Sequence, residues 1–262
     1  MRRTGSGAHG DGMTTTSSTT ADLRPAAPGS GPPLSAAARV GAGLCLVLAA
    51  LTNGLAQYAG ELLVPELDDF SAQIVWGADH RAVHVTEQTL LLLSLGVLPL
   101  GLLGLAHLTR FAAPRLSAVA VLLVLWGMWG FHNVVALGYA AGTVGPDAIG
   151  TGSAVALNEA YLEHTGTMLT ALLPHLLGSF LGLLVLVAAG LRGRSLPRVP
   201  LVLLATFLVW DFLLPSYGVL EPHLLLAVSL AWLGVHVLRL PQASWVAGPS
   251  TRRDGRQVDQ DA

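Results

Sequence analysis

The stretch QTLLLLSLGVLPLGLLGLAHLT, residues 88–109, contains 22 residues without a charge and lies between Glu87 and Arg110. A helix rises 1.5 Å per residue, so about 20 apolar residues cross the roughly 30 Å hydrocarbon core of a bilayer. Backbone inside a bilayer must satisfy its hydrogen bonds within a helix or a closed barrel, and the alternation of a barrel strand is missing here. The stretch therefore predicts a transmembrane helix.

Similar apolar runs recur along the chain, which is 52% hydrophobic and 11% charged, against about 25% charged residues in soluble domains. They predict an all-α, polytopic integral membrane protein whose partner is the lipid bilayer. The N-terminal segment 1–35, rich in Gly, Ser, Thr and Pro, and the tail 241–262 are expected to be disordered, which leaves a membrane domain over 36–240. Its six expected helices lie near residues 39–59, 88–109, 116–138, 166–190, 199–218 and 222–240.

The composition excludes several kinds of chemistry. All 14 basic residues are Arg, so a Schiff base to retinal or pyridoxal, a P-loop lysine and a lysine general base are excluded. A net charge of −2 gives no reason to expect nucleic acid as a partner. The single cysteine, Cys45, permits neither an intramolecular disulfide nor a thiol redox pair.

The arginines also orient the chain. With the N-terminus inside, 13 of the 14 arginines fall in the inner segments and only Arg81 falls outside. An excess of Arg in short loops marks the cytoplasmic side. We therefore expect a multi-pass protein of the cell membrane with both termini in the cytoplasm. In helix number, size and Arg-Leu-Ala-Val-Gly bias the chain resembles six-helix membrane proteins of high-GC bacteria, and this resemblance implies no activity.

Two weaker patterns concern helix packing. Ala-Pro-Arg-Leu at 113–116 and Leu-Pro-Arg-Val at 196–199 each precede a Trp by similar spacing, which indicates duplicated helical hairpins, although the distribution of Arg alone explains the pattern equally well. Gly178 and Gly182 allow close helix approach, either within the chain or with an oligomer partner.

Polar residues occur at a similar depth in five of the predicted helices. Counted at 1.5 Å per residue from the nearest inner Arg, they lie roughly 20–25 Å into the membrane. Ionisable groups there are costly and so mark candidate functional sites. One interpretation is a shared polar cavity in the outer leaflet, deepest at Asp211, which could bind a cation, pair with a protonated His or relay a proton; the alternative is that these groups have structural roles. The residues are Asn53, His132, His175, Asp211 and His223.

Two cofactor hypotheses remain open. If the second helix begins early, His80, His84 and Glu87 share one face, and two imidazoles with a carboxylate could bind a divalent metal such as zinc. His107 and His236 near the inner helix ends could ligate haem, but basic groups are also favourable at helix C-termini.

For the chain as a whole we expect a non-catalytic accessory subunit, sensor or small transporter. The alternatives are a metal-dependent membrane enzyme and a haem-bearing electron-transfer protein.

Overall fold

The computed structural model describes residues 36–63, 70–214 and 221–248, and every element in these ranges is a helix. The chain divides into two units, Met1–Ser30 and Gly31–Ala262, and all described residues belong to the second. The disorder predicted for 1–35 and 249–262 concerns residues outside the described ranges.

Four helices of the described part are long and apolar enough to cross a membrane. Three of them contain π-helical segments, in which hydrogen bonds run from residue i to i+5. The first is α1–η1–α2 (Ala36–Ala49, Ala50–Leu55, Ala56–Leu63), and the second is α4 (Arg81–Thr109). The third is α5–η2–α6 (Pro114–Tyr139, Ala140–Val144, Gly145–Ile149). The fourth is α8–η3–η4–α9 (Thr165–Thr167, Met168–Leu172, Pro174–Ser179, Phe180–Gly193).

Shorter helices complete the described part. Helices α10 (Arg198–Leu213) and α11 (His223–Arg239) coincide with the fifth and sixth predicted spans, and α11 is a shorter apolar helix. The all-helical fold is confirmed, whereas the number of six spans remains a prediction. Three further helices are α3 (Phe70–Asp79), α7 (Thr151–Glu163) and α12 (Gln242–Ala247).

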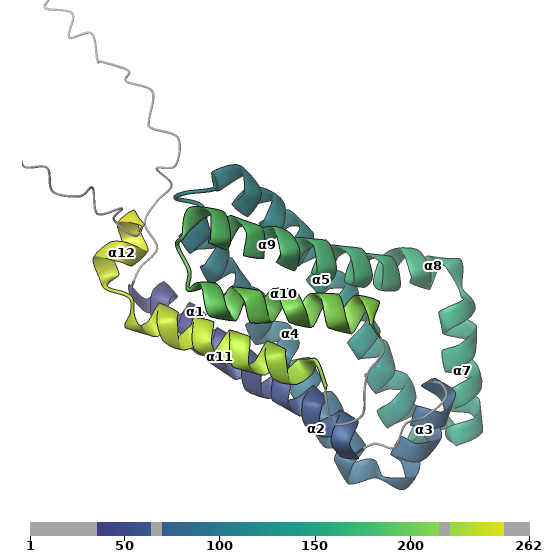
Figure 1. Ribbon diagram of the computed structural model, residues 1–262. Helices are drawn as coiled ribbons and strands as arrows, with labels where there is room; N and C mark the ends of the chain where they lie inside the picture. Colours follow the sequence, from purple (N-terminus) through teal and green to yellow (C-terminus); the bar gives the residue numbers. More distant parts are fainter. Residues whose placement is uncertain (1–35, 64–69, 215–220, 249–262) are drawn as a thin grey trace, which may run out of the picture. The chain divides into compact units, whose positions relative to one another are not determined.

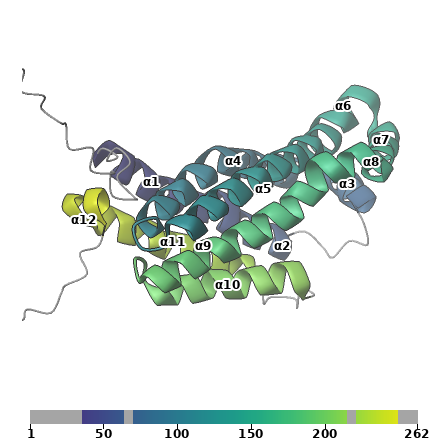
Figure 2. The same cartoon turned by 90° about the horizontal axis from the view of Figure 1, so that it is seen from above.

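The six main helices form a closed ring. Each packs on the next in sequence, α1 on α4, α4 on α5, α5 on α9, α9 on α10 and α10 on α11, and α11 packs back on α1. In Figure 1, α9, α10 and α11 lie in front of α5, α4 and α1. Figure 2 shows these two layers from above. Because α11 closes on α1, one interior space is shared by all six helices.

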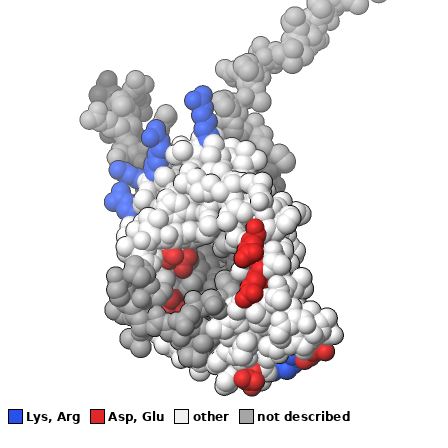
Figure 3. Space-filling model, turned by 90° about the vertical axis from the view of Figure 1, so that its right-hand side faces the viewer, with Lys and Arg blue, Asp and Glu red and all other residues white. Residues whose placement is uncertain are grey.

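The two ends of the ring differ in charge. Helices α1, α5 and α10 begin at one end of the ring, which we call the arginine end. Helices α2 and α10 finish at the opposite end, which we call the acidic end. The arginine end contains Arg39, Arg110, Arg115, Arg192, Arg194, Arg198 and Arg239. The acidic end contains Glu61, Glu87, Asp211 and Glu221. Figure 3 views the unit with acidic side chains on both sides of a hollow.

Leucines fill the ring interior toward the arginine end, where they exclude water. Less than 2% of the surface of each is exposed, so this part of the bundle is a packed core. These residues include Leu46, Leu105, Leu186, Leu201, Leu204 and Leu233.

Glycines bring α5 and the η4–α9 region into backbone contact. A Cβ added at Gly178 would lie 2.5 Å from Gly127 N, and one added at Gly182 would lie 2.7 Å from Val124 N. Both glycines therefore pack against α5 of the same chain. This contact is the small-residue type of helix packing found in membranes.

The described helices differ from the predicted ones mainly near the ends of the ring. Helix α4 begins at Arg81 rather than near 88, and α3 and α7 occupy the expected acidic loops. The tail was expected to be disordered from 241, but α12 forms over Gln242–Ala247. The reason is Trp245, which is fully buried and packs its ring 4.5 Å from that of His107.

Candidate functional site: a cavity inside the helix ring

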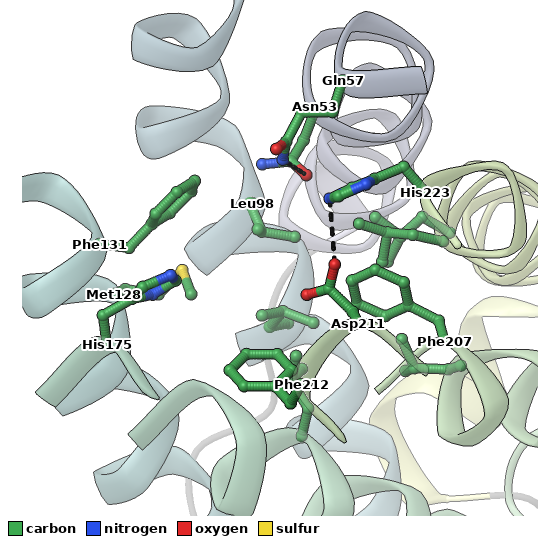
Figure 4. Close-up of a pocket in the computed structure, with 15 residues that line it drawn as sticks. Asn53, Gln57, Leu98, Met128, Phe131, His175, Phe207, Asp211, Phe212 and His223 are labelled. Carbon is green, nitrogen blue, oxygen red and sulfur yellow. Dashed lines mark hydrogen bonds and ion pairs between the residues drawn. The ribbon is translucent and has the colours of Figure 1, made fainter. Parts of the chain in front are cut away.

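A cavity of about 160 Å³ lies inside the ring, above the leucine core and toward the acidic end. Its lining comes from η1 and α2 of the first span, from α4 and α5, from η4 and α9 of the fourth span, and from α10 and α11 (Figure 4). Its described polar residues are Asn53, Gln57, His175, Asp211 and His223. The apolar ones are Leu98, Leu102, Met128, Phe131, Leu183, Leu204, Phe207, Phe212, Leu226 and Leu230. A polar cluster therefore faces a wall made mostly of hydrocarbon.

Asp211 comes from the last turn of α10 and faces His223 at the start of α11. Its Oδ1 lies 3.7 Å from His223 Nε2, and its side chain is 26% exposed (Figure 4). The other ring nitrogen, His223 Nδ1, lies 2.9 Å from Glu221 Oε2. The Glu221 side chain is only 3% exposed, and the same oxygen accepts the backbone N–H of His223. Glu221 therefore both caps α11 and fixes the orientation of the imidazole.

Asn53 stands on the π-helical segment η1 and is 3% exposed. Its Nδ2 donates to Ser94 Oγ at 3.3 Å, and its Oδ1 accepts from Gln57 Nε2 at 3.1 Å. Ser94 Oγ in turn donates to the carbonyl of Leu91 at 2.7 Å. This chain of hydrogen bonds joins η1 to α4 and holds the two amide side chains at the cavity.

His175 stands on a second π-helical segment, η4, on the opposite wall. Its ring stacks on Phe131 with centroids 4.9 Å apart and planes 17° apart, and Ser179 Oγ lies 3.4 Å from its Nδ1. Its ring centroid is 6.3 Å from that of Phe212. Thus η1 and η4 place Asn53 and His175 at the cavity, and π-bulges are frequent at functional sites.

His132 does not line the cavity. It is exposed, while the preceding residue, Phe131, takes the inward position on α5. Successive helical residues point about 100° apart, so the inward orientation of Phe131 turns His132 away from the shared space. Four of the five residues predicted at one depth are thus brought to one cavity, and His132 is not.

Acidic groups continue outward from the cavity. Glu61 on α2 interacts electrostatically with Glu221, His223 and Asp211. Glu87 on α4 interacts electrostatically with Glu61. The Glu87 side chain lies against α2, because a Cβ added at Gly60 would be 2.7 Å from Glu87 Oε1. In contrast, Arg81 at this end forms an ion pair with Asp147. The approach to the cavity is therefore rich in carboxylates.

The predicted metal site is not assembled. His80 precedes α4, stacks on Trp76 of α3 with ring centroids 4.4 Å apart and lies outside the helical face assumed for it. His84 points toward Gly142, where an added Cβ would lie 2.7 Å from its Nε2, and Glu87 points toward α2. Within the described ranges, no three His, Cys, Asp or Glu side chains are grouped so that they could hold a metal ion.

The histidines considered for haem have different surroundings. His107 Nε2 lies 2.8 Å from the carbonyl of Trp245, to which it must donate, because a carbonyl only accepts. Its ring also packs edge-on against Phe111. His236 is half-buried in the last turns of α11, and its Nε2 is buried without a hydrogen-bond partner among the described residues. His107 therefore uses its Nε2 to dock α12, and this nitrogen has no lone pair left for a metal.

Sequence reasoning missed several lining residues. Gln57 could have been found, since it lies four residues after Asn53 and so shares its helical face. Glu221 was assigned to an outer loop, and its sequence position gives no capping signal, because the preferred N-cap residues are Ser, Thr, Asp and Asn. Phe207 and Phe212 carry no such signal, because an aromatic residue in a span faces lipid, a neighbouring helix or a cavity depending on helix rotation.

Comparison with known protein families, with curated proteins and with solved structures gives no match to this chain.

Proposed function

We propose that this chain is a non-catalytic, multi-pass membrane protein that binds a small solute in its central cavity, as a sensor or a small transporter does. One observation carries the proposal: all six members of the ring, with α1–η1–α2 and η4–α9 each counted as one, line a single cavity that contains an acidic side chain in a largely apolar wall. Ligand sites in proteins are typically of this kind, mostly apolar pockets with a few convergent polar groups. Carboxylates at membrane depth that face a bundle interior also typically mark substrate or ion pathways.

The proposal includes six membrane spans. Helices α10 and α11 rise about 24 and 26 Å at 1.5 Å per residue, somewhat less than the roughly 30 Å hydrocarbon core. They pack on each other, α10 also packs on the longer span that contains α9 and α11 on the one that contains α1, and short spans are accommodated by local thinning of the bilayer. With six spans, the arginine end faces the cytoplasm and the acidic end faces outward, as the positive-inside rule requires.

Cysteine labelling on intact cells tests this orientation. In a Cys45→Ser background, Asp147→Cys places a thiol at the acidic end and Arg194→Cys places one at the arginine end. Both positions are exposed. A membrane-impermeant maleimide should label position 147 on intact cells and position 194 only after lysis. The reverse pattern, or labelling of both on intact cells, would contradict the proposed orientation.

Cavity binding is tested with one-ring probes, because the cavity is close in size to an engineered cavity of about 150 Å³ that binds benzene. Benzyl alcohol and benzylammonium are titrated into purified protein in detergent micelles and followed by saturation-transfer NMR. We expect saturable binding of at least one probe. Leu98→Trp fills the cavity and should weaken that binding at least tenfold.

Leu100→Trp is the matched control, because Leu100 lies two residues further along α4 and is 57% exposed on the outside. Leu100→Trp should leave the affinity for the probe within about twofold of that of the unmodified protein. The same variant reports any partition of the probe into the micelle. The proposed function is refuted if neither probe binds saturably, or if the two tryptophan variants behave alike.

A further inference from the structure

We propose that the ligand of the cavity is a small organic cation, namely a protonated primary or secondary amine on a compact apolar body. This inference rests on the proposed function, because it presupposes that the cavity binds a solute. It adds the charge of the ligand, the atoms that would contact it and the group on the ligand that they recognise.

The walls specify the body of the ligand. Ten of the 15 described lining residues are apolar, and three of these ten, Phe131, Phe207 and Phe212, are aromatic. The volume of about 160 Å³ suits a single ring or a branched alkyl group. The ring faces of phenylalanine also attract a cation within about 6 Å, and this attraction strengthens where water is excluded.

The charges specify the sign. Asp211 is the carboxylate among the described lining residues, Glu221 lies behind His223, and Glu61 interacts electrostatically with all three. None of the described lining residues is an arginine, and the sequence has no lysine. An anion would meet repulsion from these carboxylates with no Arg or Lys of the described lining to offset it, whereas a cation would meet complementary charge along its approach and at its site.

The hydrogen bonds specify the group that carries the charge. An ionised carboxylate only accepts, and the proposal therefore places the ring proton of His223 on Nδ1, which donates to Glu221 Oε2 at 2.9 Å. His223 Nε2 is then an acceptor, and it lies 3.7 Å from Asp211 Oδ1, a distance longer than a hydrogen bond. Two acceptors that face each other need a donor. A primary or secondary ammonium can donate one N–H to each of them, whereas a quaternary ammonium has none to give.

A metal cation fits these surroundings poorly. The described residues contain no group of three His, Cys, Asp or Glu that could hold a metal. Calcium takes six or more oxygen ligands, and magnesium keeps several waters. Most of the described lining is hydrocarbon, so a dehydrated metal ion would gain little there, whereas an organic cation can bury its apolar part against the same wall.

The first test compares probes of matched size on the unmodified protein. Benzylammonium, benzyl alcohol and benzoate differ mainly in charge, and tert-butylammonium and tetramethylammonium differ mainly in their N–H donors. We expect benzylammonium to bind at least tenfold more tightly than benzyl alcohol, and benzoate to show no saturable binding. We also expect tert-butylammonium to bind more tightly than tetramethylammonium. These comparisons do not depend on the folding of any variant.

The second test removes the charge. Asp211→Asn should weaken benzylammonium binding about tenfold or more and leave benzyl alcohol binding within about threefold. Asp147→Asn is the matched control, because it removes a carboxylate at the same end that is 63% exposed and paired with Arg81. It should leave binding of both probes within about twofold.

The outcomes separate the two proposals. If benzyl alcohol binds in a manner sensitive to Leu98→Trp but benzylammonium binds no more tightly, the cavity is a solute site and the cation inference is wrong. The same holds if tetramethylammonium binds as well as tert-butylammonium, since the donor requirement then fails. If no probe binds saturably, the proposed function itself falls.

Discussion

Gly178→Ala should break the close contact between η4 and α5. The added Cβ would lie 2.5 Å from Gly127 N, 2.7 Å from Gly127 Cα and 2.9 Å from Leu123 O. All three are backbone atoms, so no side chain can rotate away, and the two helices must separate by several tenths of an ångström. Overpacking of this kind costs about 1–3 kcal/mol, and we expect the upper end of that range here.

Part of this cost is offset, because alanine is favoured over glycine within a helix by about 0.5–1 kcal/mol. The expected net loss is therefore about 2 kcal/mol. Gly96→Ala measures the helix contribution alone, since Gly96 lies within α4 with nothing within 4 Å of an added Cβ. It should stabilise the protein by about 0.5–1 kcal/mol. The two variants should thus differ by about 3 kcal/mol, or roughly a hundredfold in the unfolding equilibrium constant.

The assay is equilibrium unfolding in dodecylmaltoside micelles titrated with sodium dodecyl sulfate, followed by circular dichroism. Gly178→Ala should unfold at lower dodecyl sulfate than the unmodified protein and Gly96→Ala at equal or higher dodecyl sulfate. If Gly178→Ala is as stable as Gly96→Ala, the backbone contact between η4 and α5 is not as close as described, and the positioning of His175 at the cavity loses its basis.

Two further substitutions test the docking of α12 and the Asn53 network. Trp245→Ala should destabilise the protein by about 3 kcal/mol, at the low end for a buried Trp because its Nε1 has no hydrogen-bond partner among the described residues. Trp232→Ala, at a site 46% exposed, should cost much less in the same unfolding assay, and equal losses would contradict the docking. Ser94→Ala removes the acceptor of the buried Asn53 amide and should cost about 1–3 kcal/mol. Ser71→Ala, which removes an exposed hydrogen bond, should cost under about 1 kcal/mol, and a reversed order would argue against the network.

The depth of polar residues could be predicted from the sequence because a helix has a fixed rise. Asn53, His175, Asp211 and His223 were expected at one level, and the structure lines one cavity with all four. Rotation about each helix axis could not be predicted in the same way. His132 has a depth similar to theirs but points outward, because packing turns Phe131 inward instead.

Helix ends and tails were harder to predict than spans. Helix α4 begins at Arg81, and His80 remains outside it, so the face assumed for a metal site does not form. The tail contains α12 because one large apolar side chain, Trp245, finds a buried place beside His107. Such long-range contacts leave little trace in local composition, which near 242–247 gives only one aromatic residue among small and polar ones.

The closure of the ring by α11 has a consequence for the order of synthesis. The first four spans of the ring supply Asn53 and His175, but Asp211 and His223 arrive on the last two, so the proposed ligand site is complete only when the whole ring has been made. A ligand that binds only the folded state stabilises it by mass action. The cognate solute, present during synthesis, should therefore favour insertion and retention of the final pair of helices, and cells lacking it should degrade more of the newly made chain.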